Sequence, residues 1–207
     1  MPLLARLTWD LVKGSSLKYS STDCAATPVN LTNHTYFNLA GRDAARSADV
    51  GDHTLEIAAA QTTGIDGDNI PTGEVLPLPE VIDFRSRKPL GPGIETFSAD
   101  EARGGGIDHY YFFGDDAEDG EMLRRGAARL AHKSRTMEVD TTEPGLNLYS
   151  ANGLNRKNFG FVRHGAICLE TQRPPDAVHH DHFPSIMLEP GDVWESTTEY
   201  RFSSFSS

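Results

Sequence analysis

Apolar and polar residues alternate along much of the chain, which is the pattern of half-buried β-strands. Leu7, Trp9 and Leu11 share one parity, and Leu55 and Ile57 form a second run of the same kind. Turn-forming segments rich in glycine and proline separate such runs, at KGSS, GIDGDNIPTGE, LGPG, RGGGID, EPG, RPPD and EPGD. Many short strands with closely spaced turn signals predict an all-β fold, a large antiparallel β-sandwich.

Two local expectations follow from the same pattern. RLTWDLV and SLKYSS are expected to form a hairpin around KGSS, with its first strand at a sheet edge because no element precedes it. Helix-like spacing occurs only around Ser98–Arg103, SADEAR, a stretch too short to define an architecture.

The composition is that of a soluble globular chain. Hydrophobic residues make up 38% of the 207 residues, charged residues 24%, and the mean hydropathy is −0.44. All-β sandwiches of this length commonly form one unit, so residues 1–207 are expected to be a single domain. No stretch approaches the roughly 20 apolar residues that span a bilayer. The start, MPLLARLTWDLVKG, lacks the apolar run of a secretory signal, so we expect a cytoplasmic protein.

The charge pattern narrows the range of partners. The formal net charge is −11, and the 19 lysine and arginine residues are scattered. Nucleic acids and anionic membranes are bound by clustered basic residues, so neither is expected, and a neutral small molecule fits better. Cys24 and Cys168 lie far apart and outside any CxxC pattern, so we expect reduced thiols with no disulfide framework or zinc site. The sequence also lacks a phosphate-binding loop, a GxSxG elbow and an HExxH motif.

His34 lies in NLTNHTYFNLAG, where the alternation breaks down, so we expect it where a strand passes into a loop. The pKa of histidine is ordinarily near neutrality, which suits a proton donor. The alternative is a half-buried histidine with ordinary hydrogen bonds.

Glu170 follows the apolar run Ala166–Leu169, which predicts a carboxylate at a mostly buried strand end. A buried carboxylate is costly unless it is paired or functional, and burial would raise its pKa while hydrogen bonds would counter that rise. Such a group is able to accept a hydroxyl proton. An outward-facing glutamate at the end of a strand is the alternative.

Asp108 follows three glycines in RGGGIDHYYFF. The glycines would let the backbone approach a ligand, and the carboxylate can accept hydrogen bonds from two neighbouring sugar hydroxyls. The alternative is a turn residue at the start of the strand HYYFF.

Three histidines surround Asp181 in AVHHDHFPS, namely His179, His180 and His182. Zinc sites usually draw spaced ligands from different elements, and adjacent residues on a strand point to opposite faces. A solvated loop before Pro184 is therefore the preferred interpretation, and no metal site is expected.

Seven segments of the chain occur in the order TPVNLTNHTYFNLAG, DHTLEIAA, IPTGEVLPL with DFR, GIDHYY, PGLNLYSAN, CLETQRPPDA and HFPSIMLEPGDVWESTTEYRF. Together they resemble the aldose 1-epimerase (galactose mutarotase) family over nearly the whole chain, as its carboxy-terminal two-thirds. The resemblance implies a β-sandwich of the galactose mutarotase type, truncated at the amino terminus. It also implies an isomerase that interconverts the α and β anomers of galactose or glucose.

The same resemblance implies a role for each candidate residue. His34 would be the general acid, Glu170 the general base, Asp108 a contact to sugar hydroxyls, and Tyr36 a neighbour in the same pocket. Glu170 would take the anomeric hydroxyl proton while His34 protonates the ring oxygen, so that the ring opens, rotates and recloses. No cofactor or metal is required for this chemistry.

Two departures from the family pattern are visible. Asn147 stands where the family has glutamine, so its sugar hydrogen bond would lengthen or pass through water. The family's upstream Asn-Arg pair and second histidine have no counterpart before His34. These departures predict a half-open cleft, weak sugar binding and self-association through exposed strand edges near residues 5–20.

Two other functions are compatible with the same fold. One is a non-catalytic carbohydrate-binding or regulatory module, which the missing arginine favours and the retained acid and base oppose. The other is a hexose-6-phosphate epimerase, which would need a basic phosphate pocket that the acidic composition does not favour.

Overall fold

The computed structural model describes residues 4–10, 14–20, 25–46, 48–100, 104–114 and 123–205. Cys24 and residues 101–103, on which two of the expectations depend, lie outside this part of the chain. No helix among the described residues is both long and apolar enough to cross a membrane.

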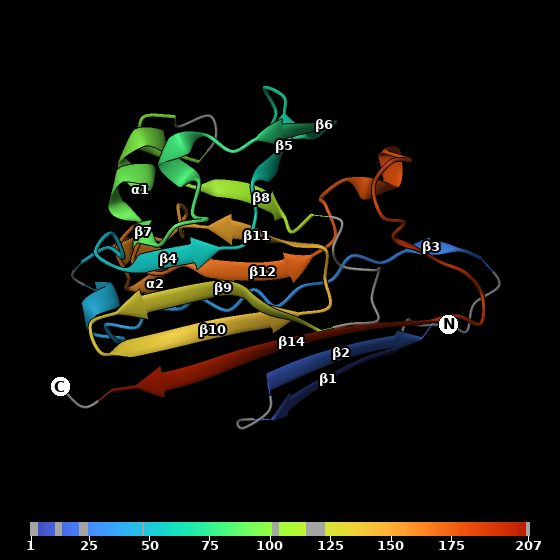
Figure 1. The fold of residues 1–207 in the computed structure, drawn as a ribbon, viewed down its shortest axis with the longest axis horizontal. Helices are drawn as coiled ribbons and strands as arrows, with labels where there is room; N and C mark the ends of the chain where they lie inside the picture. Colours follow the sequence, from blue (N-terminus) through green and yellow to red (C-terminus); the bar gives the residue numbers. More distant parts are fainter. Residues whose placement is uncertain are drawn as a thin grey trace.

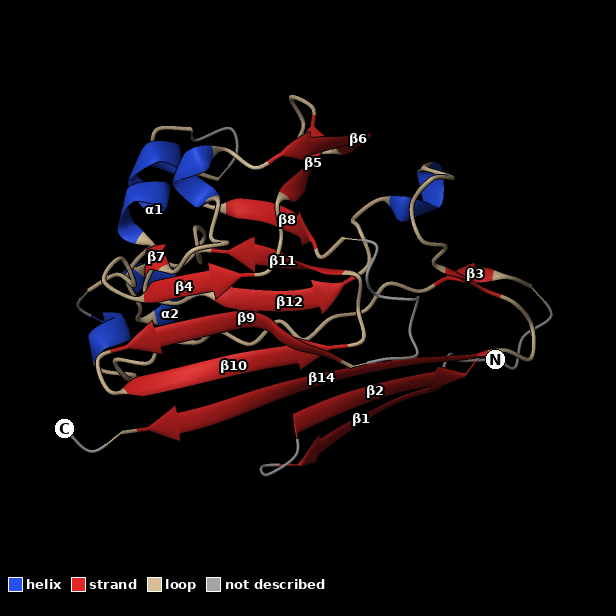
Figure 2. Cartoon of the chain, in the orientation of Figure 1, coloured by secondary structure: helices blue, strands red, loops and turns tan. Residues whose placement is uncertain are grey.

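Antiparallel strands dominate the structure, which confirms the predicted all-β class (Figures 1 and 2). The larger sheet has the order β1 (Leu4–Asp10), β2 (Gly14–Ser20), β14 (Val193–Ser204), β10 (Arg135–Thr141), β9 (Arg124–His132), β4 (Thr54–Ile57) and β7 (Lys88–Pro89). The smaller sheet has the order β12 (Cys168–Gln172), β11 (Gly145–Tyr149), β8 (Asp108–Phe112), β5 (Gln61–Ile65) and β6 (Pro71–Pro77). A short pair joins β13 (Met187–Leu188) to β3 (Thr27–Pro28).

The expected amino-terminal hairpin is present. β1 pairs antiparallel with β2, with Leu7 opposite Leu17, and β2 pairs in turn with β14. The hairpin is centred a little earlier in the chain than the sequence pattern placed it. β1 is the outer strand of the larger sheet, as expected, and has one strand neighbour in the described part of the chain.

Helices in the described part of the chain are short, and the longest begins where the sequence predicted a turn. The LGPG segment begins helix α1 (Gly91–Ser98) instead of forming a turn, so the helix precedes the expected Ser98–Arg103 stretch. Pro92 lies in the first turn of α1, where proline loses no hydrogen bond and its fixed φ angle already suits a helix. The other helical segments among the described residues are α2 (Arg156–Phe159) and the 3-10 turns Ala44–Arg46, Glu80–Ile82 and Ala177–His179.

The main core lies where the two sheets face each other. The larger sheet contributes buried residues from β4, β9 and β10, and the smaller sheet contributes them from β8, β11 and β12; they include Leu55, Ile57, Leu130, Met137, Val139, Tyr111, Leu146, Leu148 and Leu169. The Tyr200 hydroxyl of β14 donates to the Leu169 carbonyl of β12 at 3.1 Å, so polar contacts also join the sheets. This packing buries one face of the smaller sheet.

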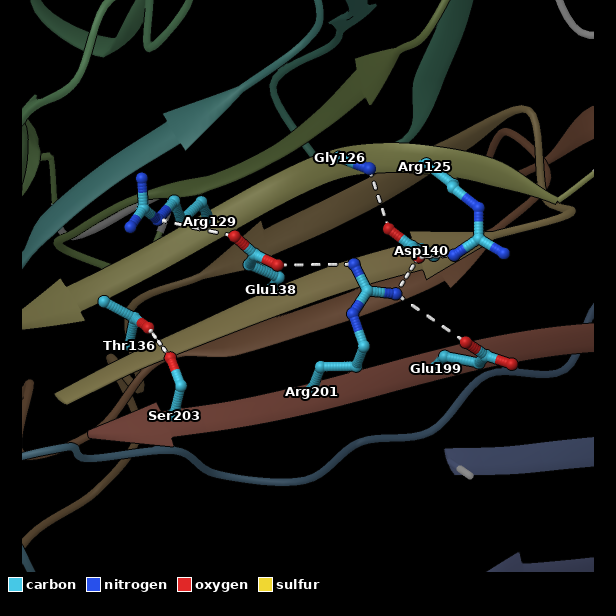
Figure 3. Close-up of polar contacts among 9 residues, drawn as sticks. All are labelled: Arg125, Gly126, Arg129, Thr136, Glu138, Asp140, Glu199, Arg201 and Ser203. Carbon is cyan, nitrogen blue, oxygen red and sulfur yellow. Dashed lines mark hydrogen bonds and ion pairs between the residues drawn. The ribbon is translucent and has the colours of Figure 1, made fainter. Parts of the chain in front are cut away.

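A buried carboxylate ties β9, β10 and β14 together on the larger sheet (Figure 3). Asp140 is fully buried as a side chain; it accepts the Gly126 backbone N–H at 2.7 Å and a hydrogen bond from Arg201. Arg201 also contacts Glu138 at 3.3 Å and thereby joins β14 to β10. Burial alone would raise the pKa of Asp140, but the hydrogen bonds from Arg201 and Gly126 lower it. The ionised carboxylate is therefore the form that the fold stabilises.

We expect Asp140→Asn to lower the free energy of unfolding by about 1–3 kcal/mol, because the amide cannot accept from all of these donors. Urea unfolding near neutral pH measures the loss. The pKa of Asp140 is lower in the folded protein, so the difference in the free energy of unfolding between wild type and Asp140→Asn should shrink as the pH falls through that lowered pKa. Asp192→Asn, at an exposed loop position, is the matched control. Equal stability of the two variants would contradict this role for Asp140.

Candidate active site

The register of β8, β11 and β12 gathers polar side chains on one face of the smaller sheet. Tyr149 of β11 lies opposite both Asp108 of β8 and Cys168 of β12. Asn147, two residues earlier on β11, lies opposite Glu170 of β12. Directly opposed residues of antiparallel strands project from the same face, so all five side chains share that face.

The other face of the same three strands is apolar. Tyr111, Leu146, Leu148 and Leu169 alternate with the polar residues and are buried in the main core. Side chains alternate across a strand, so burial of these four residues directs Asp108 and Glu170 to the opposite face of the sheet, away from the core. We call this polar face the ligand face.

A non-strand segment, residues 29–41, runs beside β12 and is held to it at both ends. Near its start, Asn30 donates to the Arg173 carbonyl at 3.0 Å and accepts the Arg173 N–H at 3.1 Å. Further along, Phe37 and Ile167 exchange backbone hydrogen bonds of 2.8 and 2.9 Å. These contacts fix the part of the segment between them against the strand that carries Glu170.

His34 lies between these two anchors. It occupies an extended stretch with no assigned strand, so the expected strand end is wrong while the expected loop is right. Its Nε2 lies 3.4 Å from Glu170 Oε1, and its side chain is 50% exposed whereas that of Glu170 is 9% exposed. Tyr36 stacks on the His34 ring at 5.1 Å, and Tyr149 meets it edge-on at 5.9 Å. The histidine is thus open to solvent on one side and held between aromatic rings on the others.

Glu170 is buried in the middle of β12 rather than at its end or facing outward. Burial is the largest influence on its pKa, the negative charge of Asp108 adds to it and His34 opposes it; together they raise the pKa of Glu170 to about 7. Oε1 is shielded from solvent and has no hydrogen-bond partner among the described residues, although His34 lies at ion-pair distance. A carboxylate with such an atom is equipped to bind a hydrogen-bond donor from a ligand.

Asp108 and Asn147 form a second polar pair beside Glu170. Asn147 Nδ2 donates to Asp108 Oδ1 at 2.8 Å, so the shorter amide points at the neighbouring carboxylate. Desolvation by burial raises the pKa of Asp108, whereas the hydrogen bond from Asn147 and the nearby His34 lower it by less. Asp108 is the first residue of β8, so the strand begins one residue earlier than HYYFF predicted.

A cleft of about 450 Å³ opens over this face of the sheet. Its lining includes Asp108, Asn147 and Tyr149, together with Thr63 and Gln172. This volume falls within the range of small-molecule pockets.

A second and more apolar hollow of about 620 Å³ borders Tyr36. Tyr36 and Tyr149 meet edge-on with their ring centroids 6.5 Å apart, and Gly153 lines both hollows, so the two hollows adjoin beside His34.

Two clusters of potential metal ligands occur among the described residues. In the first, ligand atoms of His34, Cys168 and Glu170 lie within 4.8 Å of one another. Burial, with smaller contributions from Glu170 and Asp108, raises the pKa of the Cys168 thiol far above its ordinary value. A metal needs the thiolate, so this cluster favours protonated groups over a bound cation. The second cluster is Asp52, His53 and His132.

The histidines of AVHHDHFPS are not among the residues that line the cleft. His182 contacts the Gly73 carbonyl at 2.7 Å and His180 contacts the Pro71 carbonyl at 3.3 Å, so both reach β6. His179 and His182 are exposed, as expected for a solvated loop, whereas the His180 side chain is only 17% exposed. Asp176 contacts His179 at 2.6 Å.

The structure therefore brings together all five residues singled out from the sequence, namely His34, Tyr36, Asp108, Asn147 and Glu170. Tyr149 was not predicted from the sequence as a site residue, and Cys168 was predicted only to be a reduced thiol. The alternation of side chains along a strand could have identified both residues, because residues two positions apart share a face. Tyr149 is two residues after Asn147, and Cys168 is two residues before Glu170.

Comparisons with known proteins agree on one family. The family described as aldose 1-epimerase matches residues 1–201 of the chain. Galactose mutarotase from Homo sapiens is 36% identical over 195 residues, which cover 90% of this chain and 53% of that protein. Aldose 1-epimerase from Escherichia coli is 32% identical over 196 residues, which cover 90% of this chain and 54% of that protein.

A solved structure shows the same fold. The crystal structure of galactose 1-epimerase from Lactobacillus acidophilus has a TM-score of 0.74 at 25% identity, over 92% of this chain and 52% of that chain. The chain thus spans about half the length of the relatives it matches.

The buried carboxyl of Glu170 leads to a prediction about stability. Its pKa rises from 4.5 to about 7 on folding, so folding takes up a proton between these values and stability falls as the pH rises through them. We expect Glu170→Gln to stabilise the protein at about pH 8.5, by on the order of 2 kcal/mol, and to have little effect at about pH 4.

Thermal or urea unfolding at both pH values measures this effect. Glu95→Gln, at an exposed position of α1, is the matched control and should show no such pH-dependent gain. Destabilisation by Glu170→Gln at the higher pH would show that the carboxylate is held ionised by the fold and would contradict the prediction.

Proposed function

Because the chain belongs to the aldose 1-epimerase family, we propose that it interconverts the α and β anomers of a hexose such as galactose or glucose. The observation that carries this proposal is the pair formed by His34 and Glu170. A half-exposed imidazole lies 3.4 Å from a buried carboxyl group whose pKa is raised to about 7. An imidazole next to a carboxyl group whose pKa is raised toward neutrality supplies the proton donor and the proton acceptor that anomer exchange requires.

Glu170 acts as the general base and His34 as the general acid in this proposal. The Glu170 carboxylate removes the proton from the anomeric hydroxyl, and its oxygen electron pair forms the aldehyde carbonyl. The bond from the anomeric carbon to the ring oxygen breaks, and that oxygen takes the proton of His34. The first carbon–carbon bond then rotates. Reclosure with both proton transfers reversed gives the other anomer and restores both residues.

The remaining site residues hold the sugar. Asp108 accepts hydrogen bonds from sugar hydroxyls, and Asn147 orients that carboxylate through its 2.8 Å contact. Tyr36 keeps the His34 ring in place by stacking at 5.1 Å. Groups held in position in this way reduce the entropy that must be lost to reach the transition state.

The observations favour catalysis of a neutral sugar over the alternatives. A non-catalytic module would not need a buried carboxyl group with an unpartnered oxygen, because that feature costs stability. A sugar phosphate would need cationic partners, and the described residues that line the cleft include no lysine or arginine.

Three further proposals concern the chain as a whole. We propose that residues 1–207 act as one domain, that the protein works in the cytoplasm, and that it self-associates through the outer edge of β1. The position of β1 at the end of its sheet supports the last of these.

We expect Glu170→Gln to reduce the catalysed mutarotation rate by about 10²–10⁴-fold while sugar binding survives, because the amide cannot accept the proton.

His34→Asn should lower kcat more than it changes KM, because its proton is needed chiefly in the transition state. Polarimetry of freshly dissolved α-D-galactose measures both rates above the spontaneous reaction. Glu95→Gln should retain the wild-type rate. Wild-type rates in Glu170→Gln, or a change confined to KM in His34→Asn, would contradict the assigned roles.

The pH dependence of kcat/KM gives an independent prediction. Glu170 must be ionised to act as a base, so activity should rise with pH through an apparent pKa of about 7. Asp108→Asn removes a negative neighbour that raises the pKa of Glu170, so it should move this limb to lower pH. A profile without any change between about pH 5 and 8 would count against Glu170 as the base.

A further inference from the structure

The far end of segment 29–41 is held by two hydrogen bonds at Leu39. Its backbone N–H donates to His53 Nε2 at 3.1 Å, and its carbonyl accepts from Arg135 Nη1 at 2.7 Å. Leu39 lies three positions after Tyr36 and five after His34. Its placement therefore limits where both of these side chains can lie.

The hydrogen bonds of His53 define its protonation state. Since Nε2 accepts an N–H, the proton of the neutral ring must be on Nδ1, which lies 3.2 Å from Asp52 Oδ1 and donates to it. The other oxygen of Asp52 lies 3.1 Å from His132 Nε2, and the two imidazole rings stack at 4.5 Å. A metal on Nδ1 would displace that proton to Nε2, against the Leu39 N–H, so this arrangement favours a hydrogen-bonded cluster.

We propose that neutral His53 is a positioning residue, which holds segment 29–41 by accepting the Leu39 N–H and thereby keeps His34 and Tyr36 against β12. This inference rests on the proposed function for its catalytic consequence, but the anchor itself can be tested without activity. His53 is fully buried, whereas the Asp52 side chain is 69% exposed. The contact to Leu39 is thus protected from water, in which a backbone N–H would find another partner.

The anchor holds only while His53 is neutral. A proton on Nε2 would face the Leu39 N–H and turn an attraction into a repulsion. The titratable groups that contact the ring in the described part of the chain are Asp52, beside it in the chain, and His132 at the end of β9. Burial and His132 lower the pKa of His53, while Asp52 and the Val50 carbonyl oppose them. The neutral form is therefore stabilised near neutral pH, and the anchor is expected to fail on the acid side of the ordinary histidine pKa.

The test compares two replacements of the same side chain. The carbonyl of His53→Gln reaches about as far as Nε2 and can still accept the Leu39 N–H, whereas His53→Leu cannot. We expect hydrogen exchange at the Leu39 amide to be at least about tenfold faster in His53→Leu than in wild type, and to remain slow in His53→Gln. The equivalent pair at His132, which contacts the cluster but not Leu39, is the matched control.

The same variants connect the anchor to catalysis. His53→Leu should lower kcat by about 10- to 100-fold, because a small displacement of His34 is costly, and His53→Gln should restore most of it. On acidification, after correction for intrinsic exchange, the Leu39 amide of wild type should lose protection while that of His53→Gln should not. This readout separates His53 from Glu170, whose ionisation changes the rate but not the exchange of Leu39.

The outcomes distinguish this inference from the proposed function. If wild type catalyses no mutarotation but Leu39 protection depends on His53, the anchor stands and the proposed function fails. If Leu39 exchange in wild type, His53→Leu and His53→Gln is the same, the anchor is overturned whatever the activity. If His53→Leu does not fold, loss of Leu39 protection in His53→Gln, or its pH-independence in wild type, overturns the proposal just as directly.

Discussion

The alternation of side chains on β11 and β12 is the constraint on which the site depends. Leu146, Leu148 and Leu169 are buried between the sheets, so their neighbours Asn147 and Glu170 must face the other way. A register slip of one residue on β12 would put a carboxylate into the apolar core and leave a leucine on the ligand face. The packing of the two sheets therefore also fixes the direction in which the functional side chains point.

This constraint has a cost that is visible at Glu170. Its carboxyl group is buried with an unpartnered oxygen, and its pKa is raised to about 7. Asp140 shows the opposite treatment of a buried carboxylate, because hydrogen bonds from Arg201 and the Gly126 N–H lower its pKa. One carboxylate is satisfied by the fold and joins strands, whereas the other is left incomplete. Buried polar groups that lack a hydrogen-bond partner tend to lie where a bound ligand can supply the missing partner.

The sequence predicted the strand half of the site better than the loop half. Alternation and turn residues were sufficient for the all-β class and the first hairpin, and the apolar run before Glu170 predicted its burial. Local patterns do not encode contacts between distant residues, such as Asn30 with Arg173 or Leu39 with His53. The role of Tyr149 was missed although its parity with Asn147 was available. Helix α1 was missed because Gly91 and Pro92 suggest a turn, while proline is also favourable in the first turn of a helix.

These two halves differ in how firmly they are held, and that difference bears on how the site responds to its surroundings. Asp108, Asn147 and Glu170 project from paired strands backed by the main core, so displacing them requires the sheet to open. His34 and Tyr36 project from a segment that is fixed by a small number of hydrogen bonds, at Asn30, Phe37 and Leu39. Losing one such contact costs far less than opening a sheet. Conditions that displace site residues while the fold persists should therefore act through segment 29–41, and the hydrogen bond from the Leu39 N–H to the imidazole of His53 is a contact in it that a proton can break.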